Sequence, residues 1–125
     1  MKHVLFDEWT KALRSGNWKQ GRNCLAHTNK IGPNDYCCLG VMMSVDRWSG
    51  LKKRTLGDDG LIEFRLNSNE EGMWSRPSDE YCQKIGLSPN LRDKLIDMND
   101  IEGKTFVEIA GYLEENKEKI VDEPV

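Results

Sequence analysis

The chain has 125 residues, of which 38% are hydrophobic and 31% are charged, and its net charge at pH 7 is -3. This length fits one compact domain over residues 1–125 and leaves no room for a second independent core. A net negative charge disfavours non-specific binding of duplex nucleic acid, and the absence of a run of about 18 apolar residues disfavours a membrane protein.

The N-terminal residues and the cysteines favour a cytoplasmic location for the protein. Residues 1–9 carry acids where a secretory signal needs an apolar stretch, so we expect a cytoplasmic protein. In a reducing compartment the four cysteines are expected to be buried thiols rather than disulfides. Acidic residues gather near the C-terminus, and residues 121–125 are expected to form a frayed tail.

Local signals predict amphipathic helices at both ends of the chain. Apolar residues recur at helical spacing from residue 5 to residue 14, and Gly16 then provides a stop. Later helices are predicted from their start signals, which are Pro77 or Ser78, the Ser88-Pro89 pair, and the capping box that opens at Thr105.

The most apolar part of the chain, residues 36–48, predicts a central buried helix. Asp35 is the expected N-cap, Trp48 is expected on the buried stripe, and Gly50 is the expected end. Gly40 would weaken such a helix by about 1 kcal/mol relative to alanine. We therefore expect a neighbouring backbone or a ligand to pack closely against Gly40.

One segment carries a clear β pattern. Residues 61–66 alternate apolar and charged side chains, and Asp58-Asp59-Gly60 before them is a hairpin turn signal that pairs them with Thr55 and Leu56. Residues 17–30 have no clear period and are expected to be irregular or briefly extended. The fold class predicted is α+β: a small single domain, mainly helical with four to five helices, and with one β-hairpin or small antiparallel sheet.

Residue types that serve catalysis or metal binding are present, but their spacings do not match metal-binding or catalytic motifs. Cys37 and Cys38 point about 100° apart on a helix, and no second cysteine or histidine pair accompanies them. A Cys37 nucleophile would need His27 as its base through a tertiary contact. Turns and loops explain the acidic pairs Asp58-Asp59, Glu70-Glu71 and Asn99-Asp100 more simply than acid-base chemistry. The sequence therefore predicts no catalytic residue, no metal and no cofactor.

A binding site is the remaining possibility. Residues 16–23 interleave an aromatic ring, two cations, amides and two glycines, a set suited to stacking a base and meeting phosphate oxygens. The alternative is that the ring is a core anchor in a solvated loop. The candidate ligand-binding residues are Trp18, Lys19, Gln20, Arg22, Asn23, Tyr36, Trp74 and Arg76.

Two motifs also carry a resemblance that spans nearly the whole chain except the divergent residues 51–74. Trp18-Lys19-Gln20 followed by Cys37-Cys38-Leu39-Gly40-Val41 resembles a widespread group of small bacteriophage proteins. The chain is similar to the phage anti-CBASS sponge proteins, which bind cyclic dinucleotide immune signals. The resemblance implies a homotetramer in the host cytoplasm that holds 3′,3′-cyclic GMP-AMP at a subunit interface without cleaving it.

Three hypotheses follow for the function. The first is a non-catalytic phage protein that sequesters a cyclic dinucleotide and blocks CBASS defence. The second is a small hydrolase, such as a phosphodiesterase or a thiol-dependent enzyme. The third is a phage protein that binds and inhibits a host protein through its acidic C-terminal helix.

Overall fold

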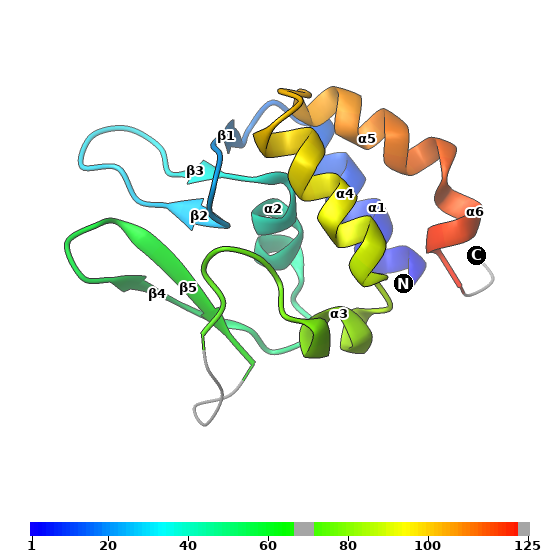
Figure 1. Ribbon diagram of the computed structural model, residues 1–125, viewed down its shortest axis with the longest axis horizontal. Helices are drawn as coiled ribbons and strands as arrows, with labels where there is room; N and C mark the ends of the chain where they lie inside the picture. The colour runs from blue at the N-terminus through cyan, green and yellow to red at the C-terminus, as the bar shows by residue number, and fades with distance from the viewer. Residues whose placement is uncertain (67–71, 123–125) are drawn as a thin grey trace.

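A computed structural model describes residues 1–66 and 72–122 of the chain (Figure 1). The helices are α1 (His3–Arg14), α2 (Cys38–Val45), α3 (Asp79–Ile85), α4 (Pro89–Asp100), α5 (Phe106–Glu115) and α6 (Lys117–Ile120). The strands are β1 (Lys19–Gln20), β2 (Ala26–His27), β3 (Asp35–Tyr36), β4 (Lys52–Leu56) and β5 (Leu61–Arg65). The predicted α+β class with mainly helical content is confirmed.

The start signals read from the sequence act as predicted. The side chains of Ser78, Ser88 and Thr105 each accept a hydrogen bond from a backbone N–H in the first turn of α3, α4 and α5. At α5 the capping box is complete, because Glu108 also accepts from the backbone N–H of Thr105. Helix α1 stops just before Gly16, whose φ of 75° favours glycine.

The central helix begins later than predicted. Asp35 and Tyr36 belong to strand β3, and the N-cap of α2 is Cys37, whose sulfur accepts from the Gly40 N–H at 3.3 Å. The expected close approach at Gly40 is confirmed, because a Cβ there would lie 1.8 Å from the carbonyl oxygen of Leu25. The helix therefore starts where β3 leaves the sheet.

The central helix also ends earlier than predicted, at Asp46 rather than Gly50. One oxygen of the buried Asp46 carboxylate accepts from the backbone N–H groups of Trp48 and Ser49, and these bonds replace the next helical turn. The prediction that Trp48 lies on a buried helical stripe is wrong, since the residue follows the helix and is 49% exposed.

The sheet is larger than the predicted hairpin. Hairpin β4–β5 forms as predicted, but the two-residue strands β1, β2 and β3 extend it into a mixed sheet of order β1-β3-β2-β5-β4. Strand β3 runs parallel to β1 and antiparallel to β2, which places Asp35 between Lys19 and His27. Backbone pairing with distant segments creates these short strands, so local patterns did not reveal them.

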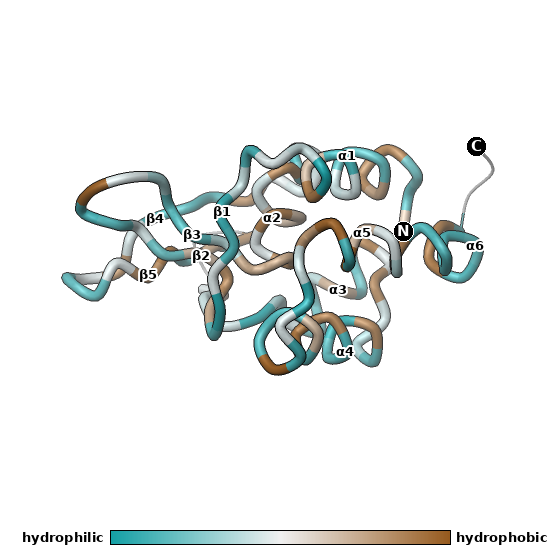
Figure 2. Tube along the Cα trace, turned by 90° about the horizontal axis from the view of Figure 1, so that it is seen from above, coloured by the Kyte–Doolittle hydropathy of each residue, from teal (hydrophilic) through white to brown (hydrophobic). Residues whose placement is uncertain are grey.

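The main core lies between α1, α2, α4 and α5, with α2 next to the sheet (Figure 2). Trp9 of α1 is fully buried, and its indole N–H donates to the carbonyl of Cys38 at 2.9 Å. The cysteines are free thiols as expected; Cys37, Cys38 and Cys82 are buried, whereas Cys24 is only half-buried.

The two ends of the described chain meet beside α3 and α6. The Met1 ammonium group donates to the carbonyls of Gly86 and Ile120, and it lies 3.1 Å from the Asp122 carboxylate. The tail predicted to fray begins at Val121. The Val121 N–H donates to the Lys117 carbonyl and the Asp122 N–H to the Met1 carbonyl. Residues 123–125 lie outside the described residues. Among the described helices, none has the length and apolar content that crossing a bilayer requires.

Candidate functional site

Two predicted ligand-binding rings meet in the structure. Trp18 lies just before β1 and Tyr36 ends β3, and their ring centroids are 4.8 Å apart at an interplanar angle of 79°. Both rings are half-buried and pack against the core on one side. On the other side they line a hollow of about 360 Å³ together with Lys19, Asn17, Pro33 and Asn34.

A second hollow adjoins the first, because Tyr36 lines both. It has a volume of about 280 Å³ and contains Arg22 together with Gly21, Cys24, His27, Asn29 and Asp35. Arg22 is exposed and forms no ion pair within residues 1–66 and 72–122. Its guanidinium extends toward Gly103, which lies in the loop between α4 and α5.

Asp35 is the unusual residue of the second hollow. Its Oδ1 is buried and makes no hydrogen bond in the described structure, although the Lys19 ammonium lies 3.2 Å away. The Lys19 side chain is 55% exposed, so water competes for its ammonium group. Buried acceptors normally find a donor. The Asp35 side chain as a whole is 27% exposed and lines the hollow, so the rest of the carboxylate is open to a ligand that carries N–H groups.

Lys53 adds a cation that the sequence patterns did not single out. It comes from β4, and its Nζ lies 6.0 Å from the Tyr36 ring centroid and 5.7 Å from that of Phe64. Its ammonium also donates to the Ser44 hydroxyl at 3.3 Å. Strand alternation alone does not reveal this contact, since β4 and β3 are brought together only by the complete sheet.

Gln20 holds β1 in place through hydrogen bonds and is not free to contact a ligand. Both of its amide N–H groups are used, one by the Asn99 Oδ1 and one by the Lys104 carbonyl, each at 2.8 Å. The fully buried Asn99 in turn accepts from the Cys38 N–H and donates to the Gly21 carbonyl. Gln20 lines neither hollow, and this network, which we call the Asn99 network, ties β1 to α2 and α4.

Three other candidates lie apart from the paired rings. Asn23 is exposed in a turn with φ of 68°, a conformation that asparagine tolerates. Trp74 and Arg76 line a third hollow of about 410 Å³ beside Arg92. Arg92 is buried and paired with two carboxylates, whereas Arg76 is largely exposed and lies 3.9 Å from Asp93, so Arg76 is the more available cation there. The structure thus divides the predicted site between separate hollows.

The thiol chemistry considered for Cys37 lacks support. Burial raises the pKa of the Cys37 thiol to about 12, so the thiol is protonated at neutral pH. The two ring nitrogens of His27 face the Asp59 carbonyl at 2.7 Å and the Asn29 amide oxygen at 3.3 Å. Neither residue is poised to activate the other.

The acidic pairs also remain structural where they are described. Asp58 and Asp59 are exposed at the hairpin turn, and Asp100 belongs to the Asn99 network. Glu70 and Glu71 lie outside the described residues. No cluster of three His, Cys, Asp or Glu side chains suited to a metal occurs in the part of the chain that the structure describes.

A family model described as a domain of unknown function (DUF8296) matches residues 1–117. The chain belongs to this family. No curated protein and no solved structure matches it. In this DUF8296 domain the rings of Trp18 and Tyr36 offer stacking surfaces, while Lys19, Lys53 and Arg22 offer positive charge nearby. Such a set can hold a planar, negatively charged molecule.

Proposed function

We propose that this protein binds a cyclic dinucleotide, such as 3′,3′-cyclic GMP-AMP, without cleaving it. In this proposal the protein is made by a phage and withholds the signal from CBASS defence in the host cytoplasm. The observation that carries the proposal is the half-buried Trp18–Tyr36 pair, which lines a hollow beside cations. The resemblance of the sequence to phage sponge proteins adds to it.

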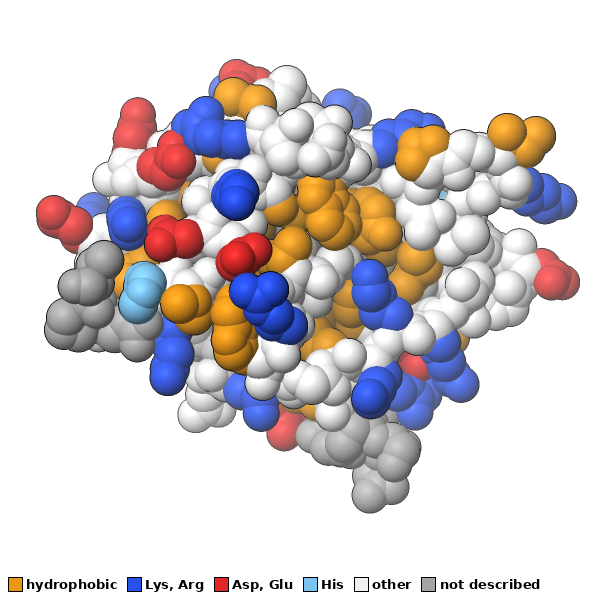
Figure 3. All heavy atoms as spheres, turned by 180° about the vertical axis from the view of Figure 1, so that it is seen from behind, with side chains coloured by type: hydrophobic (Ala, Val, Ile, Leu, Met, Phe, Trp, Pro, Cys, Tyr) orange, Lys and Arg blue, Asp and Glu red, His pale blue; other side chains and the backbone are white. Residues whose placement is uncertain are grey.

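The chemistry of the ligand matches the two adjoining hollows. A cyclic dinucleotide has two purine faces and two phosphates. The Trp18–Tyr36 pair supplies a surface for one purine. Lys19 and Arg22 line the hollows, and Lys53 lies outside their lining but 6.0 Å from the Tyr36 ring centroid; these cations supply charge for the phosphates. Apolar side chains gather in the middle of one face of the molecule, with lysine and arginine side chains and some acidic side chains around them (Figure 3).

Asp35 could distinguish guanine from adenine in the ligand. A carboxylate oxygen accepts hydrogen bonds from adjacent N–H groups, which guanine presents on its pairing edge and adenine does not present in the same arrangement. The Oδ1 of Asp35 is buried and ion-paired with Lys19, but the side chain is 27% exposed in the second hollow, so such a contact would use the other carboxylate oxygen. We therefore expect a preference for a guanine-containing ligand.

The size of the hollows favours a shared site. They measure about 360 and 280 Å³ and both open to solvent, so one chain would leave much of a cyclic dinucleotide uncovered. A pocket closed by a second copy would cover the remaining surface, in agreement with the tetramer that the resemblance implies. Exposed Arg22, near the α4–α5 loop, is available to such an interface.

The test of this proposal begins with retention of the ligand. Purified protein is incubated with 3′,3′-cyclic GMP-AMP, freed of unbound nucleotide, examined by native mass spectrometry and then denatured by heat. The expected result is a ligand-bound oligomer that releases intact nucleotide. A linearised product would favour the hydrolase, and a protein that retains no nucleotide but captures a host protein stoichiometrically would favour the third hypothesis.

Variants then test the site itself by calorimetry. Trp18→Ala and Arg22→Ala are each expected to weaken binding by about 1–3 kcal/mol, through loss of stacking or of a charge-assisted contact. Asp35→Ala should reduce the preference for cyclic di-GMP over cyclic di-AMP. Trp48→Ala, an exposed tryptophan outside both hollows, is the matched control. Unchanged affinity in the first two variants would refute the site.

The third hollow is tested separately. Trp74→Ala and Arg76→Ala remove the two predicted contacts that the structure places beside Arg92. A loss of affinity comparable with that of Trp18→Ala would join this hollow to the site in the assembled protein. Full retention of affinity would confine the ligand to the two hollows that share Tyr36.

A further inference from the structure

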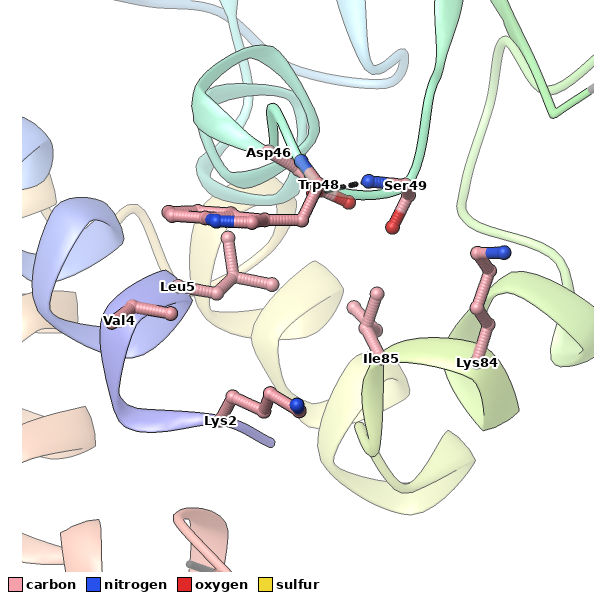
Figure 4. A pocket seen from close by; sticks show the side chains of 8 residues that line it. All are labelled: Lys2, Val4, Leu5, Asp46, Trp48, Ser49, Lys84 and Ile85. Atoms are coloured by element: carbon pink, nitrogen blue, oxygen red, sulfur yellow. Dashed lines mark hydrogen bonds between the residues drawn. The ribbon is translucent and has the colours of Figure 1, made fainter. Parts of the chain in front are cut away.

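A separate cavity lies between the start of α1, the loop after α2 and the end of α3 (Figure 4). Its volume is about 280 Å³. It shares no lining residue with the hollows around Tyr36 or the hollow beside Arg92. The lining residues are Lys2, Val4, Leu5, Asp46, Trp48, Ser49, Lys84 and Ile85.

The walls of this cavity are apolar and leave large side chains in contact with water. Leu5 and Ile85 are buried at its base, whereas Val4 is 38% and Trp48 49% exposed. The Trp48 ring lies across Leu5 in Figure 4. The Arg47 guanidinium, 4.9 Å from the ring centroid, and the bond from the Trp48 N–H to Asp46 help to hold that ring in place.

Two lysines give the cavity a positive rim. Lys2 precedes α1 and Lys84 belongs to α3, and their ammonium groups lie at opposite ends of the cavity (Figure 4). Neither lysine forms an ion pair with any residue that the structure describes. Both ammonium groups are therefore available to a ligand.

The one acidic side chain of the lining does not offset this charge by pairing with the lysines. One oxygen of Asp46 accepts from the backbone N–H groups of Trp48 and Ser49. The other accepts from the Tyr81 hydroxyl at 2.6 Å, inside the core. Asp46 thus shapes the wall of the cavity and holds the loop, while Lys2 and Lys84 face solvent.

We propose that this cavity binds a small amphipathic carboxylate, meaning a single carboxylate attached to a short alkyl chain or one aromatic ring. The apolar part would lie between Leu5, Ile85 and the Trp48 ring, where it removes exposed apolar surface from water. The carboxylate would meet the ammonium group of Lys2 or that of Lys84, one at each end of the cavity. The cavity shares no lining residue with the hollows around Tyr36, so this site is independent of the proposed function.

Titration of the full chain with octanoate, followed by two-dimensional ¹H–¹⁵N NMR, tests the proposal. The expected result is saturable shifts of the Trp48 indole N–H and of the Lys84 and Ile85 amides, with a millimolar or tighter Kd. Octanol and octylammonium carry the same chain without the negative charge, and we expect them to bind more weakly. Equal binding of octylammonium, or no shifts at millimolar octanoate, would overturn the proposal.

Substitutions locate the carboxylate contact. Of Lys2→Gln and Lys84→Gln, the variant at the end where the carboxylate binds is expected to raise the Kd of octanoate by about three- to tenfold, and the other variant should change it less. Lys119→Gln, an exposed lysine on α6, is the matched control and should leave the Kd unchanged. Both lysines are exposed, so the folded spectra of the variants should persist. Unchanged affinity in both cavity variants would contradict the assigned contact.

Discussion

The helical half of the molecule, formed by α1, α2, α4 and α5, and the sheet half, formed by the five strands and their loops, are organised by different interactions. Helices α4 and α5 carry their own start signals at Ser88 and Thr105 and bury apolar faces against one another. Strands β1, β2 and β3 have two residues each and exist only through distant partners. The sheet half therefore depends on its attachment to the helices, yet it carries the hollows around Tyr36.

Gly40→Ala attacks the attachment at its tightest point and should have the largest effect. The new Cβ would lie 1.8 Å from the Leu25 carbonyl oxygen, which also accepts from the Cys37 N–H. Because backbone cannot move aside cheaply, we expect a loss of about 3 kcal/mol or more in the free energy of unfolding. Urea unfolding measures it. Gly111→Ala, where the nearest atom is 3.9 Å from the added Cβ, is the control.

Asn99→Ala tests the second attachment. The substitution leaves the Cys38 N–H and the Gly21 carbonyl without their bonds to the buried amide, which should cost about 2–4 kcal/mol. Hydrogen exchange should accelerate at the Gly21 N–H, which donates to the Tyr36 carbonyl, more than within α5. Equal acceleration in both halves would mean that the Asn99 network is not what holds β1 in place.

Glu63 tests the sheet half alone through pH. Hydrogen bonds from Arg65 and then Arg54 lower the pKa of this carboxyl below its usual value. The stabilisation is present above the pKa of the unfolded chain and is lost as pH falls toward the folded value. Glu63→Gln should therefore lower the free energy of unfolding by about 1–2 kcal/mol at neutral pH. On acidification the variant should then lose less stability than the unsubstituted protein. Urea midpoints at pH 7 and pH 3 measure this, with exposed Glu102→Gln as control.

Thr105→Ala tests the helical half alone and should have the smallest effect. It removes one side of the capping box at α5, which typically costs about 1 kcal/mol. Thermal unfolding followed by circular dichroism measures the change. Thr105→Ser keeps the hydroxyl and should retain most of the stability.

These differences also explain how far the sequence could be interpreted. Helices α1, α3, α4 and α5 were predicted because their periodicity and caps are local properties. The β3 assignment of Asp35 and Tyr36 was missed, because it depends on β1 and β2 on either side. The exposure of Trp48 was missed because the Asp46 side chain ends α2 by bonds that spacing does not reveal.

The candidate site was predicted in part for the same reason. Trp18 and Tyr36 were selected for their chemistry, and the structure brings their rings together. Gln20 has the right chemistry but is occupied by a partner 79 residues away, which composition cannot show. Lys53 reaches Tyr36 only because the whole sheet forms. Chemistry selected residue types, whereas tertiary contacts decided which of them are free.

The outer strand β4 has a consequence for how copies of the chain can assemble. Lys52, Lys53 and Arg54 follow one another on this strand, and all three are exposed. If two copies joined their sheets through β4, these cations would face their counterparts and repel one another. These charges disfavour edge-to-edge pairing through β4, although the Arg54 charge is partly offset by Glu63, and they favour other surfaces of the molecule for assembly.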